Sequence, residues 1–192
     1  MQFIFTITKL NLIRYFLINL NYKNKSMINK KNLIIVFIFL GIITRIIPHP
    51  PNFTSLLAIA LFSGAYIKNQ YMAIVIPLLI MFISDLIIGL PISISVYISF
   101  VFITLIGTSL QNNTTGMKII KSSILASIVF FIITNFTVFI TSGMYTKNLL
   151  GFVECYIAAI PFFTNTLIST ITYSIIMFFS FKLIHRKVLL NI

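Results

Sequence analysis

The sequence predicts an all-α protein, an integral membrane bundle of about six transmembrane helices with both termini in the cytoplasm. Three observations support this fold class. The chain is 59% hydrophobic and only 8% charged, whereas a soluble domain carries about 25% charged residues. Apolar runs such as 33–47, 72–88 and 92–110 approach or reach the roughly 20 residues that span a bilayer. Basic residues flank these runs, as they do around membrane helices.

The apolar runs divide the chain into spans separated by polar or proline-containing stretches. The segment PISISVYISF alternates polar and apolar residues, as a strand in water would. An open strand in hydrocarbon leaves its backbone groups unpaired, so a helix is predicted there. A shorter helix is expected at 149–160, at the membrane surface or dipping into it. The six predicted spans are 33–47, 53–67, 72–90, 92–110, 122–140 and 161–183.

Residues 1–26 are expected to be an N-terminal extension, either not translated or disordered. Lys9 and Arg14 interrupt its apolar pieces, and Met27 opens a short basic leader before the first span. Met27 is therefore the expected start of translation, with an amphipathic surface segment as the alternative reading of 1–26. Residues 27–192 are expected to form a single six-helix membrane domain.

The lysine and arginine positions predict the orientation of the bundle. With the N-terminus in the cytoplasm, only Arg45 and Lys147 fall on the outer side. This asymmetry matches the positive-inside rule. The basic residues expected inside are Lys23, Lys25, Lys30, Lys31, Lys68, Lys118, Lys121, Lys182, Arg186 and Lys187.

Several function classes are excluded or disfavoured by the residues. The net charge of +12 does not indicate nucleic-acid binding, because no basic surface interleaved with aromatic residues is visible. The single cysteine, Cys155, rules out an internal disulfide. No metal site and no cofactor are expected, since His49, Asp85 and Glu154 lack ligand spacing. No phosphate-binding loop, HExxH or GxSxG is present. The protein is therefore not expected to be an enzyme, although an intramembrane enzyme built on these three residues stays open.

Polar residues concentrate near the expected outer ends of the spans. The segment RIIPHPPNFTS, residues 45–55, combines polar side chains with prolines that impose a stiff, extended path. Ionisable groups at membrane depth cost about 2.5–3.5 kcal/mol and therefore pair or line a cavity. We expect Arg45 and Asp85 to form an ion pair, which either belongs to a ligand pocket or only holds helices together. The predicted substrate-binding residues are Arg45, His49, Asn52, Asp85, Asn135, Glu154 and Asn165.

Small and polar residues at helical spacing predict close packing between spans. The pairs Ala60–Gly64, Ser95–Ser99 and Ser123–Ser127 follow the small-xxx-small pattern. Asn165, Ser169 and Thr172 form a polar stripe on one face of the last span, which predicts hydrogen bonds between helices.

The segments RIIPHPPNFTSLLAIALFSGAYI, FISDLIIG, FFIITNFTVF and CYIAAIPFFTNTL resemble an uncharacterised bacterial family of membrane transport proteins. The resemblance covers roughly residues 33–183. That family is similar to the substrate-binding S components of energy-coupling factor (ECF) transporters. The resemblance implies a multi-pass protein of the bacterial cytoplasmic (inner) membrane that captures an unidentified small-molecule substrate, a vitamin or related micronutrient, from outside.

The same resemblance implies protein partners. S components hand their substrate over with a coupling membrane subunit and ATPase subunits on separate chains. They often carry an Ala-xxx-Ala motif on the first helix for the coupling subunit, and residues 33–47 contain none. The nearest equivalent is Ala60–Gly64 on the second span.

A non-transporting membrane scaffold, resembling the small rod-shape-determining proteins, is the alternative function. Such a scaffold would use the outer polar cluster only for packing and would bind no solute. The sequence does not identify the substrate.

Overall fold

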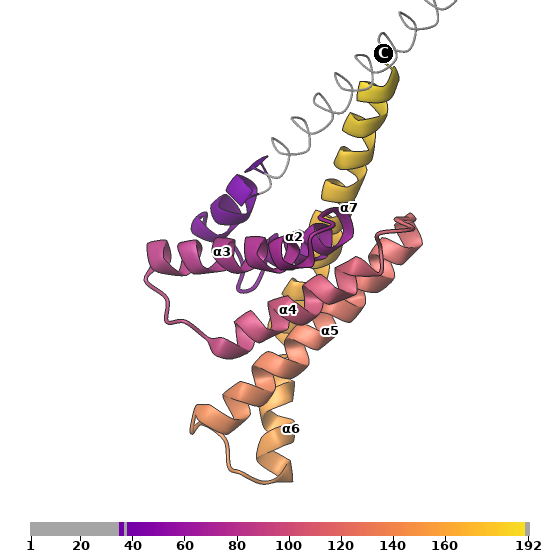
Figure 1. The fold of residues 1–192 in the computed structure, drawn as a ribbon. Helices are drawn as coiled ribbons and strands as arrows, with labels where there is room; N and C mark the ends of the chain where they lie inside the picture. The colour runs from indigo at the N-terminus through magenta and orange to yellow at the C-terminus, as the bar shows by residue number, and fades with distance from the viewer. Residues whose placement is uncertain (1–34, 37, 191–192) are drawn as a thin grey trace, which may run out of the picture.

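The protein is all-helical in the computed structural model, which describes residues 35–36 and 38–190 (Figure 1). No strand occurs in these ranges, so the predicted all-α class is confirmed. The extension 1–26 and the expected start at Met27 lie outside the described residues. A helical segment at 38–46 is followed by α2 (Leu56–Tyr66), α3 (Gln70–Ile88), α4 (Ile94–Thr108), α5 (Gly116–Thr141), α6 (Leu149–Ala158) and α7 (Ile160–Leu190).

Each expected span contains a helix, and the short helix expected at 149–160 is present as α6. The alternating segment is helical from Ile94 onward, as the argument from backbone pairing predicts. Two helices are longer than expected: α5 begins at Gly116 rather than 122, and α7 continues to Leu190 rather than 183. Hydropathy marks the apolar part of a helix, whereas its hydrogen-bonded backbone continues through lysines, which are good helix formers.

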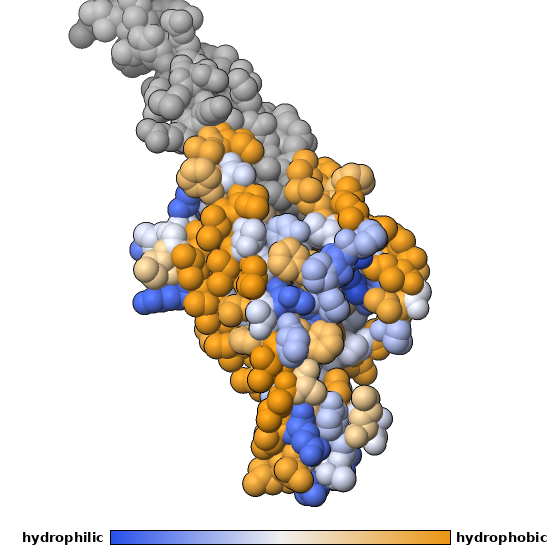
Figure 2. Space-filling model, turned by 180° about the vertical axis from the view of Figure 1, so that it is seen from behind, coloured by the Kyte–Doolittle hydropathy of each residue, from blue (hydrophilic) through white to orange (hydrophobic). Residues whose placement is uncertain are grey.

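In the described part of the chain, three helices are long and apolar enough to cross a membrane: α3, α5 and residues 160–184 of α7. Large apolar side chains are exposed on all three, for example Leu86 (63%), Met117 (65%) and Phe179 (62%). Much of the face shown in Figure 2 is apolar. Exposed apolar surface of this extent is unusual for a soluble monomer and is expected in lipid.

The remaining helices are shorter than the hydrocarbon core. At 1.5 Å per residue, α2 with 11 residues and α4 with 15 residues are about 17 Å and about 23 Å long. The core of a bilayer is about 30 Å thick. The number of six crossings therefore stays a prediction.

Helix α2 lies at the centre of the fold and is buried on all sides from Leu56 to Ala65. It packs against α3, α4, α5 and α7. Its closest approach is to α4, where a Cβ atom added at Gly64 would overlap the carbonyl oxygen of Thr104 and lie 3.0 Å from the Cα of Gly107. The Ala60–Gly64 pair thus packs closely against another helix, as predicted, and α4 covers it.

The two predicted serine pairs are also buried. Ser99 donates to the carbonyl of Ser95 and Ser127 donates to that of Ser123, at 2.7 Å and 2.9 Å. Their hydroxyls are satisfied within their own helices, so these positions contribute small volume rather than bonds between helices.

Pro77 lies inside α3, and a side chain of α2 bonds the carbonyl that this proline leaves without a helical partner. A proline has no N–H, so the carbonyl of Ala73, four residues earlier, loses its helical partner. The hydroxyl of Ser63 donates to this carbonyl at 2.8 Å. The contact satisfies a buried acceptor and ties α2 to α3.

Contacts at one end of the bundle bring several helix termini together. The side-chain amide of Gln111, just after α4, donates to the carbonyl of Gly64 at 2.9 Å. The ammonium of Lys182 on α7 donates to the carbonyl of Thr114, just before α5. The C-terminal ends of α2 and α4 and the part of α7 around Lys182 therefore lie near the start of α5. The opposite end of α2 begins at Leu56.

Candidate ligand-binding site

The loop at 47–54 lies over the end of the bundle where α2 begins. Pro48, Pro50 and Pro51 restrict its backbone. A side chain of α7 holds it: Asn165 donates to the carbonyl of Pro51 at 3.0 Å. The hydroxyl of Ser169 lies 3.5 Å from the carbonyl of Asn52, but it is closer, at 3.0 Å, to the carbonyl of Thr166 in its own helix. The loop is thus fixed at its centre as well as by its prolines.

Asn52 has a backbone conformation that few side chains adopt. Among the described residues it is the one non-glycine with a positive φ, 63°. Asparagine tolerates this left-handed region better than most residues. The side-chain amide of Asn52 makes no hydrogen bond to the described part of the chain. Residues held in such conformations often occur at functional sites.

Arg45 and Asp85 form the predicted ion pair, with Nη1 and Oδ1 2.6 Å apart. The side chain of Asp85 is 3% exposed and that of Arg45 is 11% exposed. The other carboxylate oxygen of Asp85 accepts a hydrogen bond from the hydroxyl of Tyr97 at 3.2 Å. Both oxygens of this buried acid are therefore engaged.

The contacts of Arg45 all use one nitrogen. Besides Asp85, Nη1 is close to the hydroxyl of Ser84 at 2.8 Å and to the sulfur of Met81 at 3.1 Å. The Nε and Nη2 atoms donate to none of the described residues. The guanidinium thus keeps hydrogen-bond donors that no described residue uses.

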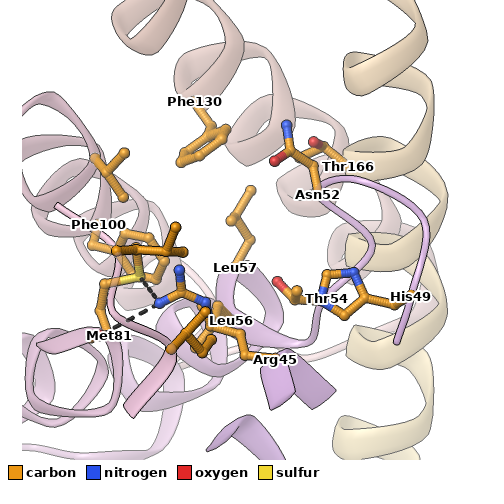
Figure 3. A pocket seen from close by; sticks show the side chains of 13 residues that line it. Arg45, His49, Asn52, Thr54, Leu56, Leu57, Met81, Phe100, Phe130 and Thr166 are labelled. Atoms are coloured by element: carbon orange, nitrogen blue, oxygen red, sulfur yellow. Dashed lines mark hydrogen bonds between the residues drawn. The ribbon is translucent and has the colours of Figure 1, made fainter. Parts of the chain in front are cut away.

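Arg45 lines a cavity of about 380 Å³. Figure 3 shows its guanidinium beside Met81, with Leu57 and Phe130 lining the space around it. The cavity therefore has a few polar groups set among apolar walls. Its lining residues are Arg45, His49, Asn52, Thr54, Leu56, Leu57, Met81, Ile88, Leu90, Val96, Phe100, Phe130 and Thr166.

A second cavity of about 210 Å³ adjoins the first. Four residues line both: Asn52, Val96, Phe130 and Thr166. The second cavity is otherwise lined by Phe131, Thr134, Asn135, Val138, Phe162 and Phe163. The two cavities are therefore adjacent, the first beside Arg45 and the second along α5 at Asn135.

The contact of His49 sets the role of its ring nitrogens. Nδ1 lies 2.8 Å from the carbonyl oxygen of Pro50. A carbonyl can only accept, so Nδ1 carries the hydrogen, and in the neutral ring Nε2 is then an acceptor.

The site contains most, but not all, of the residues predicted to bind substrate. Arg45, His49 and Asn52 line the first cavity and Asn135 lines the second. Two others support the lining: Asp85 holds Arg45, and Asn165 holds the loop. Glu154 is exposed on α6 and lines neither cavity. Among the described residues, no three His, Cys, Asp or Glu side chains are grouped as a metal ion would require.

The polar stripe on the last span was predicted to form hydrogen bonds between helices. This prediction is wrong at Thr172, because its side chain is exposed. The buried polar residues of α7 are instead Thr166, Ser169, Thr170 and Ser174. Asn165 and Ser169 do form contacts beyond their own helix, but with the loop. Spacing alone shows which residues share a face of a helix. It does not show which face packing turns toward the other helices.

Sequence reasoning also missed Thr54, Tyr97, Phe130 and Thr166. Thr54 belongs to the same polar segment as Asn52, which was the available signal. Tyr97, Phe130 and Thr166 stand in apolar runs where nothing distinguishes them from neighbours of the same type.

The fold and the cavities define a class: a protein that is all-helical in its described part, with three potential membrane-crossing helices there and two adjacent, partly polar cavities at one end of the bundle. The chain belongs to DUF6580, a family of unknown function, which it matches over residues 25–190. No curated protein and no solved structure matches it.

Proposed function

We propose that this protein is a membrane transport protein that captures a small molecule, a vitamin or related micronutrient, from outside the cell, as ECF S components do. The observation that carries the proposal is the cavity of about 380 Å³ with unused donors of Arg45 in its wall. Ligand sites are typically clefts of about 300–1,000 Å³, mostly apolar, with a few placed polar groups.

Unused polar groups favour binding over simple packing. Nε and Nη2 of Arg45, whose side chain lines the first cavity, and the exposed side-chain amide of Asn52 make no hydrogen bond to the described residues. A scaffold that needed Arg45 and Asp85 only to hold helices together would not require such free polar groups beside a cavity. A ligand with complementary groups would satisfy them.

The orientation we propose has six spans, both termini in the cytoplasm and the cavity open to the outside of the bacterial cytoplasmic membrane. Support comes from charge: Lys182 contacts Thr114 at the end of the bundle away from the cavity, and Lys118 and Lys121 lie in the first turns of α5. An excess of lysine marks the cytoplasmic side. In a Cys155→Ser background, a cysteine at Lys68 should be protected from an impermeant maleimide in intact cells, and one at Pro50 should react. The reverse pattern contradicts the orientation.

A coupling membrane subunit and ATPase subunits are the proposed partners. The chain has no phosphate-binding loop of its own, so energy would come from other chains. The Ala60–Gly64 pair is buried against α4. A coupling subunit would therefore dock on another surface.

The decisive experiment is purification from native membranes, followed by mass spectrometry of retained small molecules and of co-purified proteins. We expect a retained small molecule together with a membrane subunit and ATPases. Asn52→Gly should reduce the retained amount, because glycine keeps the positive φ but removes the amide. Glu154→Gln, outside both cavities, is the matched control.

Retention that is unchanged by Asn52→Gly would contradict binding in this cavity. Co-purification of cell-wall proteins without any retained small molecule would instead support the scaffold.

A further inference from the structure

We propose that the ligand is an elongated amphipathic carboxylic acid, with its carboxylate at Arg45 and an apolar body that extends past Phe130 toward Asn135. This inference rests on the proposed function, because it names the chemical class of the captured substrate. Four features of the site support it: the charges that line it, the free edge of Arg45, the start of α2 and the shape of the walls.

The charges in the site are unsuited to a cation. The chain has only two acidic residues, Asp85 and Glu154. Asp85 is already bonded through both oxygens to Arg45 and Tyr97, and Glu154 is exposed on α6. Neither lines either of these two cavities. A cationic ligand would therefore meet a guanidinium and no free carboxylate.

The free edge of Arg45 suits a carboxylate. Asp85, Ser84 and Met81 all contact Nη1. The unused Nε and Nη2 atoms share one edge of the planar guanidinium. Two parallel N–H groups on such an edge match the two oxygens of a carboxylate. Asp85 neutralises the charge of Arg45 from one side and leaves this edge for a second acceptor.

The start of α2 adds to the positive character of the same cavity. Ser55 precedes the helix but makes no capping hydrogen bond to it; its hydroxyl is instead 2.9 Å from that of Thr44. Leu56 and Leu57, the first residues of α2, line the cavity. The N-terminus of a helix carries partial positive charge, which favours a nearby anion.

The walls define the rest of the ligand. Leu57, Phe100 and Phe130 line the first cavity, and Phe131 and Phe163 line the second. Aromatic side chains in this number favour a body with a ring. At the far end, the amide nitrogen of Asn135 donates to the carbonyl of Phe131 at 2.8 Å, while its oxygen has no partner among the described residues. A hydrogen-bond donor on the distal part of the ligand would fit there.

The test uses three probes with the same body: phenylvalerate, its primary amide and the corresponding phenylpentylamine. The readout is the melting temperature of the detergent-purified protein, since a ligand that binds only the native state raises it with concentration. We expect the acid to act at about tenfold lower concentration than the amide, because hydrogen bonds to charged groups are worth more than neutral ones. The amine should have no effect.

Arg45→Lys tests the role of the free edge. Lysine keeps a positive charge for Asp85 but lacks the second pair of N–H groups. We expect the response to phenylvalerate to weaken about tenfold, with little change in the melting temperature without probe. Glu154→Gln should respond like the wild type.

An amide or amine that stabilises as strongly as the acid overturns the inference, and so does an Arg45→Lys variant with an unchanged response to acid. A molecule retained from native membranes that is not an acid also overturns it, yet leaves the proposed function standing. If no molecule is retained and no probe binds, the proposed function fails and this inference fails with it.

Discussion

The two ends of α2 differ in how closely the neighbouring helices approach. Near its C-terminal end, the backbone at Gly64 touches Thr104 and Gly107 of α4 so closely that a methyl group has no room. At its first turn, Leu56 and Leu57 face a cavity of about 380 Å³. Both ends are buried and apolar, so hydrophobicity does not explain the difference. The residues on the facing helices differ in size: Gly107 permits backbone contact at one end, whereas Phe100 and Phe130 line the cavity at the other.

The two ends also differ in how their polar groups are satisfied. Near the closely packed end, Ser63 donates to the carbonyl of Ala73, and Gln111 donates to that of Gly64. At the end of α2 that begins at Leu56, called here the open end, the Nε and Nη2 atoms of Arg45 have no partner among the described residues. The side chain of Arg45 lines the cavity of about 380 Å³. Under the proposed function, the closely packed end serves stability and the end with the cavity binds the ligand.

Breaking the ion pair at the open end should have the largest effect on stability. Arg45→Gln leaves Asp85 as an unpaired, buried charge, which costs about 3–5 kcal/mol in the free energy of unfolding. Asp85→Asn should cost less, because Arg45 borders a cavity that water can enter. Unfolding in mixed detergent micelles measures both.

The double variant Arg45→Gln with Asp85→Asn should recover part of the loss, since no charge is then unpaired. Purely additive losses would mean that the two side chains do not interact.

Filling the closely packed end should have the next largest effect. Gly64→Ala places a methyl group against the carbonyl of Thr104 and the backbone of Gly107. Overpacking of this kind costs about 1–3 kcal/mol, and the backbones of α2 and α4 would have to separate. Gly116→Ala, where an added Cβ has nothing within 4 Å, is the control and should not destabilise the protein. Equal effects at the two glycines would contradict the close contact between α2 and α4.

The polar contact beside Pro77 should have the smallest effect of the three. Ser63→Ala leaves the buried carbonyl of Ala73 without a donor, at a cost of about 1–2 kcal/mol. In a Pro77→Ala background, the restored N–H of residue 77 can bond this carbonyl instead. The Ser63→Ala effect should then largely disappear. The comparison of the four unfolding free energies measures this coupling, and a Ser63→Ala effect of the same size in both backgrounds would show that the contact is independent of the proline.

The sequence by itself determined which segments are helical and where the polar loop lies. The helices follow from long apolar runs, in which hydrocarbon leaves the backbone no other way to pair its groups. The Arg45–Asp85 pair also followed, because a charge at membrane depth needs a partner and the chain offers two acids.

Only the tertiary structure decided which polar residues meet. It brings Arg45, His49 and Asn52 to one cavity, leaves Glu154 exposed, and adds Tyr97 and Thr166, which no pattern marked. The physical reason is that helices in lipid are apolar on their outer faces as well as their inner ones. Periodicity then cannot show which face turns inward, so the rotation of each helix is set by packing, such as the contact of Gly64 with α4.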